Sequence, residues 1–336
     1  MTARRWIGPL ATLLFVVLVW ASPTRASQNR DLPLFDTHLH YSSDAWDDYP
    51  VEVALALLEQ AGVYRALVSS TPDEGTLALH DSAPDRIVPV LRPYRTREDM
   101  TTWAHDPSII TYVEERLSRQ NYRGIGEFHL SVGEAGAPVP RAFAGLAIAQ
   151  DLFLHAHADA LAVEQLVSLY PEVKVLWAHA GMSARPATVE RLVTTYPNLW
   201  VELALRTDVA PDGWIDRAWA DLFVRHPDRF MIGSDTWVPA RWGALPANLA
   251  AIHVWLRQLP RDVAAQIAYR NAEGLFGSPS VDRPATSRTA GSRLGSIVAR
   301  NCGKEKWPGG GPQDDCAGGP GPRPHRDASL YLPHRG

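Results

Sequence analysis

The chain has only two cysteines among its 336 residues, Cys302 and Cys316, and both lie near the carboxyl terminus. The region between residues 34 and 277 therefore contains no thiol, which excludes a cysteine nucleophile and a cysteine-ligated zinc site there. In an oxidising compartment the two cysteines could form a disulfide, or they could stay free, because their spacing alone does not decide between these states.

An excess of positive charge is also lacking. The formal net charge is -4 at neutral pH, and 37 acidic residues outnumber 33 lysines and arginines. Nucleic acid as the main partner would require a basic surface, so this balance argues against it. Because 46% of the residues are hydrophobic, the chain can build a large core, and we expect its partner to be a small-molecule substrate.

Long hydrophobic runs are confined to the amino terminus. Arg4 and Arg5 precede an apolar run at residues 10–20, and Thr24-Arg25-Ala26 then offers small residues, Thr24 and Ala26, at the positions that a signal peptidase reads. This order predicts a signal peptide over residues 1–26 and an exported protein, either periplasmic or secreted. The apolar run is short for a membrane span, although an uncleaved leader that anchors the chain to a membrane is the alternative.

Between residues 34 and 277 the sequence alternates apolar, β-rich runs with stretches whose apolar residues recur at helical spacing. This alternation favours a parallel sheet wrapped by helices. Eight repeats favour a closed (β/α)8 TIM barrel over an open doubly wound sheet, which is the alternative. The expected strands cover residues 34–40, 64–70, 86–92, 123–130, 151–157, 173–179, 199–205 and 229–235, and the expected helices include 51–61, 139–149, 159–170, 185–196, 241–258 and 261–272.

The carboxyl-terminal segment has a different composition. Residues 278–336 contain ten glycines and eight prolines in 59 residues, with few large apolar side chains. Such a composition cannot bury enough apolar surface to form a core. We therefore expect a disordered tail at 278–336, after a single domain at 27–277.

The first expected strand ends in a His-x-His motif, made by His38 and His40. Side chains alternate between the two faces of a strand, so these two imidazoles point the same way. Two imidazoles side by side at the end of a buried strand are costly unless something binds them, and a metal ion is the usual ligand. Paired histidines on a surface or in a core without a metal are the alternative.

Histidine and carboxylate side chains also end four later apolar runs. In a barrel, the carboxyl ends of the strands meet at one rim, where active sites lie, so we expect these groups to converge there. They are Glu127 and His129 in Gly124-Ile125-Gly126-Glu127-Phe128-His129, His155 and His157 in Leu154-His155-Ala156-His157, His179 in Ala178-His179-Ala180-Gly181, and Asp235 in Ile232-Gly233-Ser234-Asp235.

This order of motifs resembles the amidohydrolase superfamily. With the run Asn271-Ala272-Glu273-Gly274-Leu275-Phe276-Gly277, it is most similar to the amidohydrolase-related branch, and the resemblance spans residues 34 to 277. That branch contains metal-dependent hydrolases and also nonoxidative decarboxylases and hydratases. The resemblance therefore implies a metal-dependent enzyme on a TIM barrel.

The resemblance also implies roles for individual residues. His38, His40 and His155 would be metal ligands, and Asp235 would contact the metal and accept the proton of the attacking water. Imidazoles and carboxylates suit zinc, and also manganese, iron or nickel. A bound divalent ion lowers the pKa of its water to about 7, which makes hydroxide available at neutral pH.

Two further residues would decide whether one or two metal ions bind. His179 would be a ligand of the second metal in a binuclear site, or a proton donor and polarising group in a mononuclear one. Glu127 stands where some relatives have a carboxylate that bridges two metals and others have a carboxylated lysine. A structural ion pair of Glu127 with Arg92 or Arg123 is the alternative.

The sequence offers three candidates for contact with the substrate: Arg92, His129 and His157. Arg92 could clamp a substrate carboxylate or form a structural salt bridge, and Arg206 could do the same. His129 and His157 could contact substrate, or could orient a ligand or cap a helix. These arguments give no role to Glu202 on the strand at 199–205.

The main functional hypothesis is hydrolysis of a small ester, amide or lactone bond by metal-activated water. A metal-dependent decarboxylase or hydratase of a small carboxylic acid is the first alternative, and Arg92 or Arg206 facing the metal would favour it. An exported, non-catalytic metal-binding module is the second alternative, which a closed shell of four ligands would favour.

Overall fold

The computed structural model describes residues 31–277. The predicted leader at 1–26, the predicted tail at 278–336 and the possible pair Cys302 and Cys316 lie outside these residues. Within residues 31–277, no helix is both long enough and apolar enough to cross a membrane.

Eight parallel strands form the centre of the fold. They pair in the orders β1-β2-β3 and β4-β5-β6-β7-β8, and a parallel bridge between Leu91 and Ile125 connects β3 to β4. The N–H of Thr37 donates to the carbonyl of Ile232 at 3.0 Å, which connects β8 back to β1. The sheet thus closes on itself, which confirms the predicted (β/α)8 TIM barrel. The strands are β1 (Leu34–Leu39), β2 (Val63–Val68), β3 (Ile87–Pro89), β4 (Gly124–Leu130), β5 (Phe153–Ala158), β6 (Lys174–Trp177), β7 (Leu199–Glu202) and β8 (Phe230–Met231).

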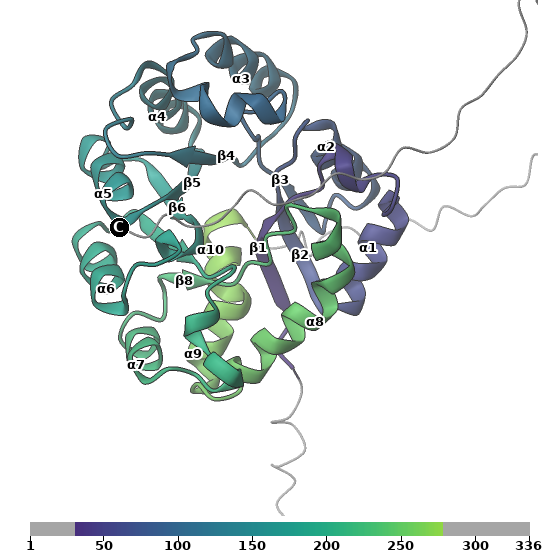
Figure 1. Ribbon diagram of the computed structural model, residues 1–336, viewed down its shortest axis with the longest axis vertical. Helices are drawn as coiled ribbons and strands as arrows, with labels where there is room; N and C mark the ends of the chain where they lie inside the picture. The colour runs from purple at the N-terminus through teal and green to yellow at the C-terminus, as the bar shows by residue number, and fades with distance from the viewer. Residues whose placement is uncertain (1–30, 278–336) are drawn as a thin grey trace, which may run out of the picture. The chain divides into compact units, whose positions relative to one another are not determined.

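Helices surround the strands as an outer ring (Figure 1). Two of them begin at an aspartate that caps the free backbone N–H groups of the first turn: Asp159 accepts from Ala162, and Asp216 accepts from Ala218 and Trp219. The helices are α1 (Val51–Gln60), α2 (Glu74–Ser82), α3 (Ser108–Arg119), α4 (Pro138–Gln150), α5 (Ala160–Leu169), α6 (Pro186–Thr195), α7 (Arg217–Arg225), α8 (Pro239–Leu256), α9 (Arg261–Ala265), the π-helical turn η7 (Gln266–Arg270) and α10 (Asn271–Phe276). Short 3-10 turns are η1 (Ser43–Ala45), η2 (Arg97–Thr101), η3 (Trp103–His105), η4 (Ala178–Gly181), η5 (Thr207–Val209) and η6 (Pro211–Gly213).

The amino-terminal end of the barrel is closed by aromatic side chains. The ring of Phe276 in α10 lies 4.6 Å from that of Phe153 and 6.2 Å from that of Phe35, and these two residues lie at the starts of β5 and β1. All three are buried in one hydrophobic cluster. Since this packing blocks one end of the barrel, a ligand can enter only from the carboxyl ends of the strands.

Several strands are shorter than the sequence predicts. The expected strand at 173–179 ends at Trp177, and the one at 229–235 covers only Phe230–Met231. Neither His179 nor Asp235 can belong to a strand, because their φ values of 56° and 52° are left-handed. The chain therefore turns at the rim, and this turn carries both side chains.

Candidate metal centre

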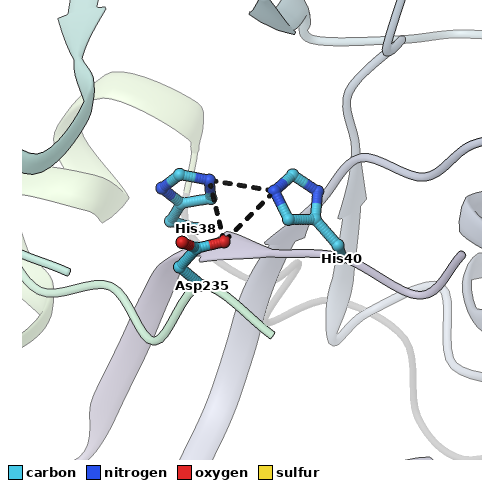
Figure 2. A group of neighbouring side chains, drawn as sticks. All are labelled: His38, His40 and Asp235. Atoms are coloured by element: carbon cyan, nitrogen blue, oxygen red, sulfur yellow. Dashed lines mark hydrogen bonds and ion pairs between the residues drawn. The ribbon is translucent and has the colours of Figure 1, made fainter. Parts of the chain in front are cut away.

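The His-x-His motif at the end of β1 forms the centre of the site. As the alternation along the strand predicts, both imidazoles point to one side, and their Nε2 atoms lie 3.0 Å apart. The side chain of Asp235 points at the same pair, with Oδ1 at 3.6 Å from His38 Nε2 and 3.4 Å from His40 Nε2 (Figure 2). All three side chains are buried.

Glu127 of β4 adds a second carboxylate to this group. Its Oε2 lies 3.2 Å from His40 Nε2 and 3.5 Å from His38 Nε2. The same oxygen accepts a hydrogen bond from Arg92 Nη2 at 3.0 Å. Arg92 thus forms a buried ion pair with Glu127, and this pair holds its guanidinium beside the metal-ligand candidates, 3.4 Å from His40 Nδ1.

The spacing of the two imidazoles from each other and from each carboxylate fits a metal ion. Two ligand atoms at tetrahedral positions around an ion such as zinc stand about 3.4 Å apart. The separations given above, from His38 and His40 to each other and to the two carboxylates, run from 3.0 to 3.6 Å. Two imidazoles and two carboxylates are donors that divalent zinc, manganese or iron accepts.

Hydrogen bonds at Nδ1 orient three imidazoles so that their Nε2 atoms can bind a metal ion. The Nδ1 of His40 lies 2.6 Å from the carbonyl of Ser69, and that of His179 lies 3.0 Å from the carbonyl of Ala204. A carbonyl can only accept, so Nδ1 carries the hydrogen and Nε2 keeps a lone pair. The Nδ1 of His38 donates likewise to a carboxylate oxygen at 2.9 Å.

His179 follows β6 in the turn η4, and its Nε2 faces the carboxylates. That atom lies 3.5 Å from Glu127 Oε1 and 3.9 Å from Asp235 Oδ2. It is buried and has no hydrogen-bond partner among the described residues. A buried lone pair without a donor costs free energy, and a cation would satisfy it.

The electrostatics of the site attract a cation. Burial alone would lower the pKa of His38, but the carboxylates of Glu127, Glu202 and Asp235 raise it well above its usual value. Burial raises and the surrounding imidazoles lower the pKa of Glu127, with a net shift well below its usual value, so this group stays ionised. The excess of carboxylate charge would favour any divalent ion that binds the imidazole lone pairs.

Glu202 is the functional residue that the sequence arguments leave without a role. It ends β7 and is fully buried, and its Oε1 is the acceptor for His38 Nδ1 at 2.9 Å and for the N–H of His179 at 2.7 Å. Its Oε2 accepts from the N–H of Ala204 at 2.7 Å. Burial raises its pKa, but His38 and His179 outweigh this and lower it to about 2. Glu202 therefore orients two of the predicted ligands, His38 through its ring Nδ1 and His179 through its backbone N–H.

Replacement of Glu202 by glutamine is expected to weaken metal binding about 10–100-fold, the usual cost of removing a group that orients a metal ligand. All three partners of the carboxylate are N–H donors, and an amide has only one oxygen to accept them. Competition with a chelating dye would measure the affinity. The matched control is Glu164→Gln, which alters only an exposed pair with Arg191, and equal affinities for both variants would contradict this role.

The two histidines of β5 occupy different surroundings. His155 is buried behind His38, with the two rings 4.6 Å apart, and its Nε2 has no partner among the described residues. Burial first, and the charge of His38 second, lower the pKa of His155 well below its usual value. His157 is 31% exposed at its side chain, and its Nδ1 lies 2.9 Å from Glu127 Oε1.

His129 lies beside His157 on the neighbouring strand, and their rings stack at 4.5 Å. The hydroxyl of Tyr94 accepts from the N–H of His129 at 2.8 Å and lies 3.2 Å from its Nδ1. Burial lowers the pKa of His129 to about 4, so its ring is neutral at neutral pH. The pair forms the outer, partly exposed edge of the site.

Arg206 does not face the metal-ligand candidates. Its guanidinium donates to the carbonyls of Ala180 and Ala184 at 2.9 and 2.8 Å, and it pairs with Asp208. Arg206 therefore fixes the loop that follows His179, and unlike Arg92 it is not held beside the metal-ligand candidates.

Comparison with known proteins places these observations in a family. A family model described as amidohydrolase matches residues 35–278, in agreement with the resemblance of the motifs. No curated protein sequence matches the chain.

Solved structures with the same fold have little sequence in common with the chain. A probable 2-pyrone-4,6-dicarboxylic acid hydrolase from Acinetobacter baumannii with citric acid bound is 16% identical, covers 73% of this chain and 100% of its own, and has a TM-score of 0.50. A TatD homologue from Escherichia coli is 18% identical, with 74% and 99% of the two chains covered and a TM-score of 0.52. At this identity the likeness concerns the barrel alone.

Proposed function

The chain belongs to the amidohydrolase family, and from that premise we propose that it is a hydrolase that cleaves a small ester, amide or lactone bond with metal-activated water. The observation that carries the proposal is the convergence of three imidazole Nε2 atoms and two carboxylates at the open end of the barrel. His38, His40 and Asp235 would hold a divalent ion, which we propose to be zinc, and Glu127 lies within 3.5 Å of the same two imidazoles. When bound, such an ion supplies Lewis acidity and lowers the pKa of water at the site.

Asp235 is the residue that we propose as the proton acceptor. Its carboxylate lies at the rim, where a left-handed backbone turn and a 2.7 Å hydrogen bond from its own N–H to the carbonyl of His38 fix its direction. It is largely buried, so few waters compete for its lone pairs. A carboxylate in this position can take the proton of the attacking water and return it to the leaving group.

The number of ligands supports a catalytic centre over a structural one. A structural zinc site has four protein ligands in a closed shell. Here one group of candidate ligands consists of His38, His40 and Asp235, and three protein ligands leave a fourth position for water or substrate. The partial exposure of His157 leaves this side of the group open to a substrate.

The position of Arg92 supports the decarboxylase or hydratase as the second candidate function. A carboxylic acid substrate would need a cationic group beside the metal to hold its carboxylate. Arg92 lies 3.0 Å from Glu127 Oε2 and 3.4 Å from His40 Nδ1, beside the proposed ligands, whereas Arg206 donates to backbone carbonyls and to Asp208.

Turnover and metal content together test this proposal. The purified protein is expected to contain at least one equivalent of divalent metal and to hydrolyse a member of a panel of small aryl esters, lactones and anilides. Dialysis against dipicolinate should remove both the metal and the activity, and added zinc or manganese should restore them.

Three results would count against the proposal. A protein that binds no zinc or manganese has no metal centre of this kind. Release of carbon dioxide from small aromatic acids without hydrolysis of the panel would establish the decarboxylase alternative. Full metal loading without any turnover would support a non-catalytic binding module.

A further inference from the structure

A cavity of about 720 Å³ lies between α8 and the loop that follows β7. The described residues that line it include none of the imidazoles or carboxylates of the candidate metal centre. Leu203 lines the cavity, while the preceding residue, Glu202, faces His38. Because neighbouring residues of an extended chain point to opposite sides, the cavity lies on the outer side of the sheet, behind the metal centre.

The walls of this cavity are mainly apolar. Leu203, Val209, Leu249 and Trp255 line it and are buried, whereas Ala251 of α8 lines it and is exposed. The cavity therefore opens to solvent beside Ala251. Sites for small organic ligands are typically cavities of about 300–1,000 Å³ with apolar walls and a few polar groups. The size and the walls of this cavity fit such a ligand.

Arg241, in the first turn of α8, brings a positive charge to the cavity. Its Nε donates to the carbonyl of Asp235, and its Nη2 donates to that of Ser234 at 2.6 Å. Among residues 31–277, no carboxylate lies within 4.0 Å of its guanidinium, and its Nη1 has no hydrogen-bond partner. Two carbonyls thus hold the guanidinium in place, while its charge stays unpaired and one nitrogen stays available to a ligand.

The other charged groups of the lining compensate one another or face water. Arg206 pairs with Asp208 and donates to the carbonyls of Ala180 and Ala184, so the charges of this pair cancel. Asp212 is exposed, and water screens its charge. The unpaired charge of Arg241 therefore gives the cavity its preference for an anion.

The backbone of the loop after β7 supports a ligand site here. Leu205 lines the cavity with a left-handed φ of 61°, a conformation that is rare for a bulky side chain. Strained residues of this kind concentrate at sites that bind ligands. Because Arg241 also holds the carbonyl of Asp235, a ligand on Arg241 would lie against the turn that carries the proposed proton acceptor.

We propose that this cavity binds a small organic anion with an apolar body, such as a medium-chain carboxylate, and that the anionic group pairs with Arg241. The apolar walls would cover the body of the ligand, and Arg241 Nη1 would donate to its oxygen. The site goes beyond the proposed hydrolysis, because it shares no residue with the candidate metal ligands and requires no metal ion.

Calorimetric titration of the full chain with octanoate and with octanamide tests the preference for charge. Octanamide has the same apolar chain without the charge. We expect one octanoate per protein and about 10–100-fold weaker binding of octanamide, the usual contribution of a hydrogen bond between charged groups. Arg241→Gln keeps an N–H donor but removes the charge. Octanoate should therefore bind this variant as weakly as octanamide does, while the affinity for octanamide stays unchanged.

A pair of tryptophan substitutions on α8 locates the site. Ala250 and Ala251 are both exposed, but only Ala251 lines the cavity. We expect Ala251→Trp to abolish octanoate binding and Ala250→Trp to keep it. A ligand that binds only the folded protein raises its unfolding temperature, so octanoate should raise that temperature in Ala250→Trp and not in Ala251→Trp.

Three results would overturn the proposal. Equal binding of octanoate by the two tryptophan variants would place the ligand elsewhere, for example on the metal ion. Equal affinities of the unsubstituted chain for octanoate and octanamide would remove Arg241 from the site. Binding of neither ligand to the unsubstituted chain would refute the cavity as a site of this kind. None of these measurements depends on turnover or on metal content, so they leave the proposed hydrolysis untouched.

Discussion

Replacement of Asp235 by asparagine is expected to lower kcat about 10²–10⁴-fold at saturating metal, the usual contribution of a positioned general base. Asparagine has the same shape as aspartate and also tolerates the left-handed backbone, here with φ 52°, so the fold should be kept. Its amide cannot take a proton from water. The measurement is kcat for a substrate identified in the panel, with thermal unfolding to confirm that the variant is folded.

Asp212 supplies a matched control for this substitution. It is an exposed aspartate on the loop after β7, and its φ is also 52°. Asp212→Asn thus makes the same chemical change on the same backbone conformation, away from the imidazoles, and should leave kcat unchanged. A kcat for Asp235→Asn as high as that of Asp212→Asn would remove Asp235 from the proposed chemistry.

The barrel could be predicted because its signals are local. Each strand is a short apolar run followed by a helical pattern, and eight such units leave few arrangements of the chain. The ends of the strands were predicted less well. The expected strand at 229–235 has only two residues in a strand, and Asp235 at its expected end has a left-handed backbone that apolar patterning does not reveal.

The candidate ligands could be found for a similar reason. His38, Glu127, His179 and Asp235 each follow an apolar run, and a barrel brings the ends of such runs together. In the structure, the Nε2 atoms of both imidazoles lie within 3.9 Å of an oxygen of each carboxylate. The assignment of metal ligands among them stays a prediction until metal is measured.

The sequence alone could not identify which residues pair with individual charged groups. Arg92 could have been a substrate clamp, and only the fold shows that it lies 3.0 Å from Glu127. Glu202 contacts His38, a residue 164 positions away. One signal for Glu202 was present: a carboxylate at the end of an apolar run must find donors if it is buried. The sequence could not say which donors, because the contact depends on the closure of the barrel.

Gly233 shows how closely the site depends on Glu202. A Cβ added at this glycine would lie 2.4 Å from Glu202 Oε2, 2.8 Å from the Cβ of His38 and 3.2 Å from that of Ala204. Distances this short cannot be accommodated unless the carboxylate or β1 moves. The glycine of the Gly-Ser-Asp motif is therefore required to leave room for the carboxylate that orients His38.

Gly233→Ala is accordingly expected to destabilise the fold by about 1–3 kcal/mol, the usual cost of overpacking, and to weaken metal binding through the displaced Glu202. Denaturant unfolding and chelator competition would measure the two effects. Gly145→Ala in α4 is the control, because its added Cβ meets nothing within 4 Å and should stabilise the helix by about 0.5–1 kcal/mol.

A double-mutant cycle identifies the cause of that loss. If the clash with the Glu202 carboxylate is responsible, Glu202→Ala removes the obstacle, and Gly233→Ala should cost less in that background, with a coupling of about 0.5–3 kcal/mol. Glu202→Gln keeps the shape of the side chain, so Gly233→Ala should cost the same there as in the unsubstituted protein. Equal costs in the alanine and glutamine backgrounds would instead assign the strain to β1, at the Cβ of His38.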